Sequence, residues 1–260
     1  MSFEVAADAY DRFMGRYSSQ LVAQMLDLAD VRPDHSALDV GCGPGALTAG
    51  LVARLGAAAV CAVDPSAPFV AATRERHPGV DVRVASAEQL PFDDGRFDVA
   101  LAQLVVHFMA DPVIGLGEMR RVVRPGGVVA ACVWDHAGGR SPVADFWRAA
   151  VAIDPAAHTE ADLNGARQGH LAELFDAAGL TEIHDTVLSA EVAYDSFEDW
   201  WQPYTAGVGP AGAYLASLAP DRREAVRRGC AELLGPPPFT VTGRAWAARG
   251  TRAGVAQTRP

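Results

Sequence analysis

The stretch LDVGCGPGALT, residues 38–48, decides the fold of this 260-residue chain. Three glycines and a proline lie between an apolar run and a segment with helical spacing. A loop of this kind, between a strand and a helix, lets a ligand approach the backbone closely. The glycines alone leave the identity of that ligand open.

Strand-like and helix-like segments alternate around this loop as far as about residue 134. The predicted strands are nearly continuous apolar runs at residues 37–41, 57–64, 80–86, 96–104 and 126–134. Apolar residues at helical spacing lie between them, at 18–30, 45–56, 66–77 and 111–123, and Ser18 or Ser19 can cap the first helix. Strands that are apolar throughout are covered on both faces, so the pattern predicts an α/β fold with an open, doubly wound parallel sheet.

Composition narrows the classes of function. The net charge of −10 makes nucleic acid a poor partner, and all 22 basic residues are arginines, so no lysine is available for a Schiff base or a phosphate loop. The four cysteines form no CxxC pair and the seven histidines show no ligand spacing, so we expect no metal site. With no signal-peptide core and no apolar run of about 18 residues, the sequence predicts a cytoplasmic protein that does not enter a membrane.

Two ligands compete for the glycine loop. A dinucleotide motif, G-x-G-x-x-G, begins at Gly41 and Gly43 but has Ala46 at its last position. An acidic variant, acid-x-G-x-G-x-G, is matched throughout by Asp39, the first two glycines and Gly45. A carboxylate aimed into the turn would repel a pyrophosphate about 4 Å away by roughly 1 kcal/mol in water, and it suits a cationic ligand.

Asp64 ends the second predicted strand, 21 residues after Gly43. A carboxylate at this position can accept both hydroxyls of a ribose, which indicates a nucleoside without choosing between the two ligands. The alternative is a helix N-cap.

Two longer segments after the loop also have a recognisable pattern. They are VASAEQLPFDDGRFDVALAQLVVHFMADP, residues 84–112, and EMRRVVRPGG, residues 118–127. Together with the loop, they resemble class I S-adenosylmethionine (SAM) methyltransferases over about residues 36–134. AYDRFMGRYSS and VWDHAGGRSPVADFW, at residues 9–19 and 133–147, are similar to a bacterial small-molecule branch of that family. The resemblance implies a Rossmann-like, doubly wound, mostly parallel seven-stranded sheet whose last strand is antiparallel.

The resemblance also implies a domain plan and a cofactor site. It implies one domain over 1–260, with a core at about 30–190 and 238–250, an N-terminal lid at 1–20 and helical insertions at 135–168 and 191–237. The residues expected to bind SAM, with S-adenosylhomocysteine as product, are Tyr10, Arg16, Tyr17, Asp39, Gly41, Cys42, Gly43, Gly45, Asp64, Pro65, Ser66, Ser86, Ala87, Glu88 and Gln103. Ser86 departs from the family pattern, which has an acid there, and Glu88 can instead cap the following turn.

The expected chemistry lies at the strand ends. His107 follows the fourth strand, where the family often has a histidine; it is either a base or a histidine hydrogen-bonded at a helix start. Asp135 is the second catalytic candidate, with a solvated loop as the alternative. Trp134, His136, Trp201 and Tyr204 are expected to contact the acceptor, although the last two can equally form the core of an insertion.

The implied function is transfer of the methyl group of SAM to an oxygen, nitrogen or carbon atom of a small organic acceptor, by in-line displacement, in metabolite or natural-product biosynthesis. A SAM-fold enzyme with other chemistry, such as a cyclisation, and a nicotinamide-dependent oxidoreductase remain alternatives. A monomer or a homodimer is expected.

Overall fold

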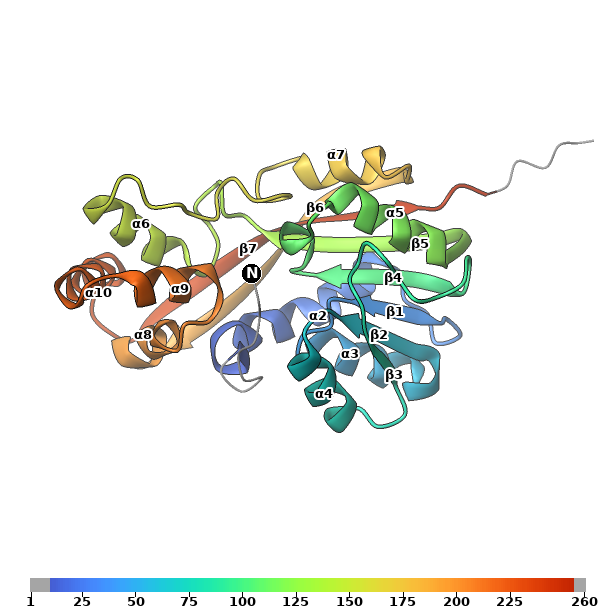
Figure 1. Cartoon of the computed structure of the whole chain (residues 1–260), viewed down its shortest axis with the longest axis horizontal. Coiled ribbons are helices and arrows are strands. Elements are labelled where there is room, and N and C mark those ends of the chain that lie inside the picture. The colour runs from blue at the N-terminus through green and yellow to red at the C-terminus, as the bar shows by residue number, and fades with distance from the viewer. Residues whose placement is uncertain (1–9, 255–260) are drawn as a thin grey trace, which may run out of the picture.

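The computed structural model describes residues 10–254, and its centre is one sheet in the order β3-β2-β1-β4-β5-β7-β6 (Figure 1). The strands are β1 (Ala37–Val40), β2 (Val60–Asp64), β3 (Asp81–Val84), β4 (Phe97–Gln103), β5 (Val123–Trp134), β6 (Thr181–Tyr194) and β7 (Phe239–Thr251). β1 to β5 pair in parallel, and β7 is antiparallel to both of its neighbours. The predicted doubly wound, seven-stranded sheet with an antiparallel last strand is confirmed.

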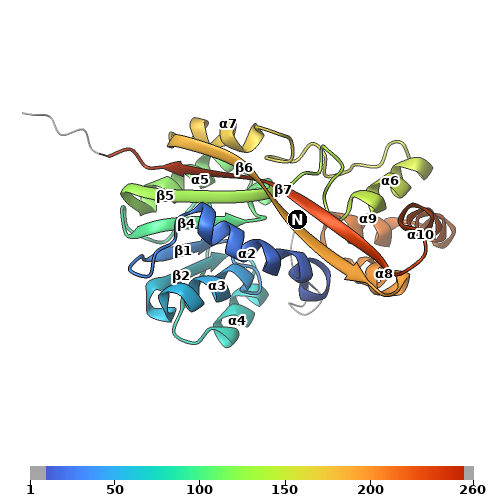
Figure 2. The same ribbon diagram turned by 180° about the vertical axis from the view of Figure 1, so that it is seen from behind.

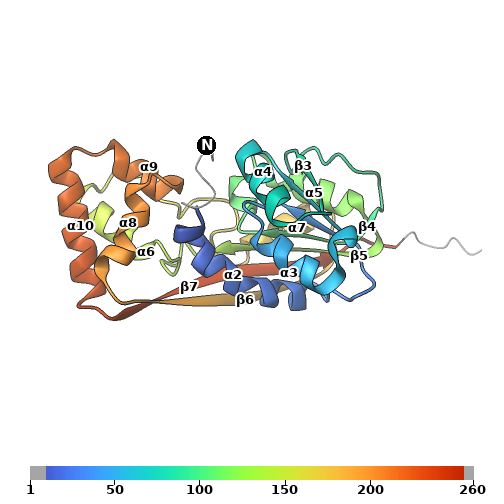
Figure 3. The same ribbon diagram turned by 90° about the horizontal axis from the view of Figure 1, so that it is seen from below.

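Helices cover both faces of this sheet. They are η1 (Asp11–Gly15), α2 (Arg16–Leu28), α3 (Ala46–Leu55), η2 (Ala57–Ala59), α4 (Ala67–Arg76), η3 (Val106–Phe108), α5 (Pro112–Val122), α6 (Ala144–Ile153), α7 (His170–Ala177), α8 (Phe197–Thr205), α9 (Gly209–Ser217) and α10 (Pro220–Leu234). α2 and α3 lie on one face, and α5 and α7 lie on the other (Figure 3). In β4, Val99 and Leu101 therefore pack with α2 and α3, while Ala100 and Ala102 pack with α5 and α7, which is why the strand is apolar throughout.

The start of the first helix differs from the prediction. Helical backbone is already present at Tyr10, and η1 runs directly into α2. Ser18 is buried inside the helix and donates to the carbonyl of Gly15 at 3.4 Å, so it is not a cap. Apolar spacing identified the helix, but the preceding turn, Asp11–Gly15, is a π-helix, whose period differs from 3.6 residues.

The insertions gather at one end of the molecule. β6 and β7 pair from Thr181–Thr251 to Tyr194–Phe239, whereas β5 pairs with β7 only as far as Trp134–Ala245. The two-stranded ribbon therefore continues past the carboxyl end of β5, as Figure 2 shows from behind. It carries α8, α9 and α10, which with α6 form a helical lobe near the carboxyl ends of the parallel strands. Ligands bind at those ends in sheets of this type.

None of the helices between residues 10 and 254 is long and apolar enough to cross a membrane.

Candidate active site

The glycine loop forms one wall of a cavity that is partly open to solvent. Gly43 is in the left-handed region, with φ of 52°, and a Cβ built there would meet no atom within 4 Å. The missing side chain therefore leaves open space at the cavity. The cavity is lined by Tyr10, Gly41, Gly43, Asp64, Pro65, Phe69, Gln103, Leu104, Val105 and Phe108.

Asp64 ties the end of β2 to this loop. Its Oδ2 accepts from the backbone N–H of Gly43 at 2.9 Å, and its Oδ1 accepts from that of Ser66 at 2.8 Å. Burial raises the pKa of the Asp64 carboxyl, against those two bonds. Each oxygen retains a lone pair, so the carboxyl can accept further hydrogen bonds from a ligand in the cavity.

Asp39 lies beneath the loop and does not line the cavity. Its Oδ2 accepts from the Thr48 hydroxyl at 2.6 Å, and the side chain is 1% exposed. Burial, with a further contribution from the charge of Asp64, raises the pKa of the Asp39 carboxyl to about 7, against the hydrogen bond from Thr48. Successive side chains of a strand point to opposite faces of the sheet. In β1, the Asp39 side chain points to the face covered by α3, and α3 carries Thr48.

The structure brings six of the residues predicted for the cofactor into the wall of this cavity: Tyr10, Gly41, Gly43, Asp64, Pro65 and Gln103. Gln103 donates to the carbonyl of Ser18 at 3.0 Å, and its buried Oε1 has no hydrogen-bond partner among the described residues. Gly45 and Ser66 stand just behind, at the N-termini of α3 and α4. The Cys42 side chain points into a small apolar cluster, so only its backbone belongs to the loop.

Five other predicted residues lie outside the cavity wall. Arg16 donates to Asp199 and to the carbonyl of Ala193, and the Tyr17 hydroxyl is 2.9 Å from that of Tyr194. These contacts direct both side chains toward β6 and α8. Ser86, Ala87 and Glu88 follow β3 without lining the cavity, and Glu88 accepts from the N–H of Ala110 at 2.7 Å, ahead of α5. The lid predicted over residues 1–20 lies partly outside the described residues, at 1–9.

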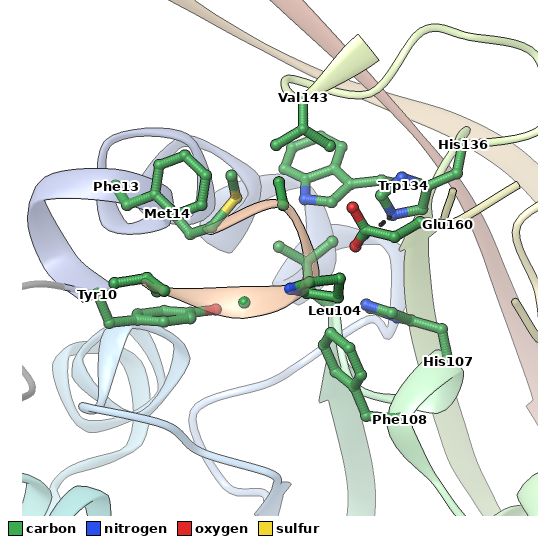
Figure 4. Close-up of a pocket in the computed structure, with 14 residues that line it drawn as sticks. Tyr10, Phe13, Met14, Leu104, His107, Phe108, Trp134, His136, Val143 and Glu160 are labelled. Carbon is green, nitrogen blue, oxygen red and sulfur yellow. Dashed lines mark ion pairs between the residues drawn. The ribbon is translucent and has the colours of Figure 1, made fainter. Parts of the chain in front are cut away.

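A second cavity adjoins the first and shares Tyr10, Leu104 and Phe108 with it. Leu104 is held in the left-handed region, with φ of 63°, between the two. Tyr10, Phe13 and Met14 lie opposite a polar wall in the view of Figure 4. The full lining is Tyr10, Phe13, Met14, Leu104, His107, Phe108, Trp134, His136, Val143, Glu160, Val208, Gly209, Pro210 and Ala211.

Of the residues predicted for chemistry and for the acceptor, His107, Trp134 and His136 line this second cavity. Asp135 does not, because its Oδ1 accepts from the N–H of Gly138 at 2.8 Å and closes the turn after β5. Trp201 and Tyr204 also stand outside the lining. The Tyr204 ring stacks on Phe146 at 4.8 Å, in the core of the helical lobe.

Two parts of the lining were not predicted. Glu160 is 6% exposed and lies in the sequence HTE, residues 158–160, which shows no spacing typical of a site. Residues 208–211 belong to the sequence GVGPAG, which has the spacing G-x-G-x-x-G but no predicted strand before it. A buried acid follows from packing between distant segments, which the sequence does not display. The Gly-Pro start of α9 was the available signal for the second part.

Burial suppresses charge on the polar wall. It lowers the pKa of His107 well below its usual range, with a further contribution from His136, and it lowers the pKa of His136 to about 4. It raises the pKa of Glu160 to about 7, against the hydrogen bond from Trp147. His136 Nε2 and Glu160 Oε1 are 3.9 Å apart, and the imidazole is uncharged near neutral pH, so the contact is not a salt bridge there.

Residues 38–131 match the family model described as a methyltransferase domain. Malonyl-[acyl-carrier protein] O-methyltransferase from Pseudescherichia vulneris is 37% identical over 131 residues, which cover 50% of this chain and 50% of that protein. The matches to the first curated relatives span between 34% and 52% of those proteins' lengths.

Solved structures share the fold at low identity. Geranyl diphosphate C-methyltransferase from Streptomyces coelicolor, in complex with Mg²⁺, geranyl diphosphate and S-adenosyl-L-homocysteine, has a TM-score of 0.53 and 17% identity. It matches over 90% of this chain and 79% of that one. The [4+2]-cyclase SpnF has a TM-score of 0.55 and 20% identity, over 91% and 81% of the two chains. The methyltransferase-domain match at residues 38–131 and the fold shared with these structures agree with the predicted resemblance to class I, SAM-dependent methyltransferases.

Proposed function

We propose that this protein binds SAM in the cavity beside the glycine loop and transfers its methyl group to a small organic acceptor in the adjoining cavity. The observation that carries the proposal is the buried carboxyl of Asp64 in the cavity wall, with the Asp39 carboxyl beneath the loop as a second negative group close to it. Neither forms an ion pair within residues 10–254, and burial raises both pKa values. A cationic ligand relieves this strain on the carboxylates, whereas a pyrophosphate adds to it.

The residues of the first cavity fit a sulfonium nucleoside. Asp64 retains acceptor capacity for ribose hydroxyls, and the unpartnered Oε1 of Gln103 suits an ammonium group. SAM supplies an electrophilic methyl group on a cationic sulfur. Crystals of the related geranyl diphosphate enzyme hold S-adenosyl-L-homocysteine, which supports the same ligand class here.

The meeting of the two cavities provides the place for transfer. Tyr10, Leu104 and Phe108 border both spaces. His107 lines the acceptor side, and its Nδ1 is buried without a partner among the described residues. Because its pKa is depressed, the imidazole is neutral and can accept a proton from an acceptor. Asp135 is held by its turn, so it acts by positioning the loop that carries His136.

We also propose roles for the lid and the insertions, a biological setting and an oligomeric state. Residues from about 1 to 20 would close over the cofactor, and the insertions at 135–168 and 191–237 would shape the acceptor site within one domain. The biological setting would be cytoplasmic biosynthesis of a small molecule, by a monomer or a homodimer. The O-methyltransferase relative supports a small acceptor of this general kind.

Binding measurements test the cofactor assignment. We expect calorimetry to show binding of SAM and S-adenosylhomocysteine but not of NADH. Asp64→Asn should weaken SAM binding roughly 10- to 100-fold, because a hydrogen bond to a charged group contributes about 1.5–3 kcal/mol. Glu75→Gln, at an exposed position on α4, is the matched control and should bind normally. Binding of NADH without SAM would overturn the proposal.

The cyclase among the structural neighbours favours a second candidate, in which the same fold catalyses a cyclisation. Product analysis separates the two. A methyl transfer releases S-adenosylhomocysteine and gives a product heavier by one CH₂, whereas a cyclisation leaves the substrate mass and SAM unchanged.

A further inference from the structure

The polar groups of the second cavity gather on one wall. His107, His136 and Glu160 lie together there, from η3, the turn after β5 and the segment after α6 (Figure 4). The opposite side is apolar except for the Tyr10 hydroxyl. A bound molecule is therefore held by its apolar body on one side and by one polar group on the other.

Glu160 is fixed in place by the protein. Trp147 Nε1 donates to Glu160 Oε2 at 2.7 Å, and this hydrogen bond is buried. The other oxygen, Oε1, is the one that faces His136 Nε2 at 3.9 Å. This separation exceeds a direct hydrogen bond.

His136 has spare hydrogen-bonding capacity. Neither of its ring nitrogens has a partner among the described residues, although its side chain is only 3% exposed. A buried polar group left unsatisfied costs about 1–3 kcal/mol. A neutral imidazole has one donor and one acceptor, so a ligand that both donates and accepts satisfies the pair best.

The groups on this wall also exclude charged ligands. With both imidazoles uncharged, the wall offers no cation to a carboxylate or a phosphate. Burial raises the pKa of Glu160 to about 7, so its carboxyl is partly protonated near neutral pH and offers an ammonium ion less than a full counter-charge. A hydroxyl group remains, since it donates and accepts without carrying charge.

We propose that His136 and Glu160 form a clamp for the hydroxyl group of a neutral, largely apolar acceptor. The inference rests on the proposed function and names its substrate class, alcohols or phenols. The hydroxyl oxygen forms the bond to the methyl carbon as the carbon–sulfur bond of SAM breaks, S-adenosylhomocysteine leaves, and the hydroxyl proton passes to the neutral imidazole of His107, which lines the same wall. Glu160 recognises the hydroxyl through its free oxygen, and Trp147 positions Glu160.

A matched set of probes tests the clamp. The protein is saturated with S-adenosylhomocysteine and titrated with 2-naphthylmethanol, 2-methylnaphthalene, 2-naphthoic acid and 2-naphthylmethylammonium. We expect the alcohol to bind most tightly, about 10-fold better than the methyl analogue, as one or two buried hydrogen bonds imply. Tighter binding of either ion, or no alcohol binding at millimolar concentration, would overturn the clamp.

Variants separate a clamp from a structural role. In Glu160→Gln and His136→Asn, the preference for the alcohol over 2-methylnaphthalene should shrink to about 3-fold or less, while the affinity for 2-methylnaphthalene itself persists. His158→Asn, two residues from Glu160 and exposed, is the control and should keep the full preference. An unchanged preference in both clamp variants contradicts the inference.

Titration with S-adenosylhomocysteine distinguishes failure of the proposed function from failure of the clamp alone. Loss of S-adenosylhomocysteine binding in the wild-type protein would overturn the proposed function and the clamp together. Normal S-adenosylhomocysteine binding with a preference for an ion would overturn the clamp alone.

Discussion

At the scale of single residues, Gly43 is the position where one added methyl group should reduce ligand affinity while the protein still folds. Its φ of 52° and the open space at its Cβ mean that Gly43→Ala adds a methyl group to the cofactor cavity at the cost of about 1–2 kcal/mol of backbone strain. We expect S-adenosylhomocysteine affinity to fall at least about 10-fold in calorimetry.

Gly56 provides the control for this change. It also has a positive φ, 82°, with nothing within 4 Å of its Cβ, but it ends α3 away from the cavity. Gly56→Ala should lose at least as much stability, because its ψ of 151° lies in a region that is open essentially to glycine alone, and it should keep normal affinity. Equal affinity losses in the two variants would show that strain, and not the cavity, governs binding.

Asp39 predicts a pH dependence of stability. The folded protein keeps the proton of Asp39 up to about pH 7, whereas the unfolded chain loses it near pH 4. A raised acid pKa means that stability is highest below about pH 4 and is lost as pH rises to about 7. In Asp39→Asn this loss is absent, because the amide cannot ionise and its oxygen still accepts from Thr48.

The expected result is that Asp39→Asn unfolds at a higher temperature than the wild type at pH 8, by several degrees, and that the difference narrows toward pH 4.5. Thermal melts across this range measure it. A constant difference at all pH values would show that Asp39 is ionised throughout, in conflict with its burial.

At the scale of elements, the helical lobe supports the second cavity from behind. The Tyr204 ring of α8 stacks on Phe146 of α6 and packs edge-on against Phe13, which lines the cavity. Tyr204→Ala should cost about 3–5 kcal/mol of stability and weaken acceptor binding, with S-adenosylhomocysteine affinity nearly unchanged. Tyr204→Phe keeps the ring and should behave as wild type; a matching loss in that variant would point to the hydroxyl instead.

Sequence patterns predicted the sheet well because a strand that is buried on both faces consists almost entirely of apolar residues. The runs around Leu38, Val63 and Leu101 are apolar for that reason, and their order fixed the place of the glycine loop. Glu160 was missed because its burial depends on Trp147 and on the lobe, in a segment without periodicity. The same limit applies to Trp201, whose surroundings depend on how three helices pack.

At the scale of the whole molecule, one apolar core connects the sheet and the lobe. Buried residues from α2, β5, α6, α8 and β7 belong to the same cluster. Four tryptophans, Trp134, Trp147, Trp200 and Trp201, lie in it, so their fluorescence reports chiefly on this side of the protein. Unfolding followed by fluorescence and by far-ultraviolet circular dichroism should therefore coincide.

S-adenosylhomocysteine provides the perturbation for this experiment. At 100 times its Kd it should stabilise the folded state by about 2.7 kcal/mol and shift both transitions upward together. An early fluorescence transition that the ligand leaves in place would show that the lobe unfolds independently.

The β6–β7 ribbon allows the segment at its end to vary during evolution while the sheet stays the same. Tyr194 and Phe239 face each other across the ribbon, so the chain leaves the sheet and returns to it at neighbouring points. Segments of different length can be accommodated between those points without shifting any strand register. The half of the molecule that is proposed to bind the nucleoside can thus be inherited unchanged while new chemical selectivity is acquired at the end of the ribbon.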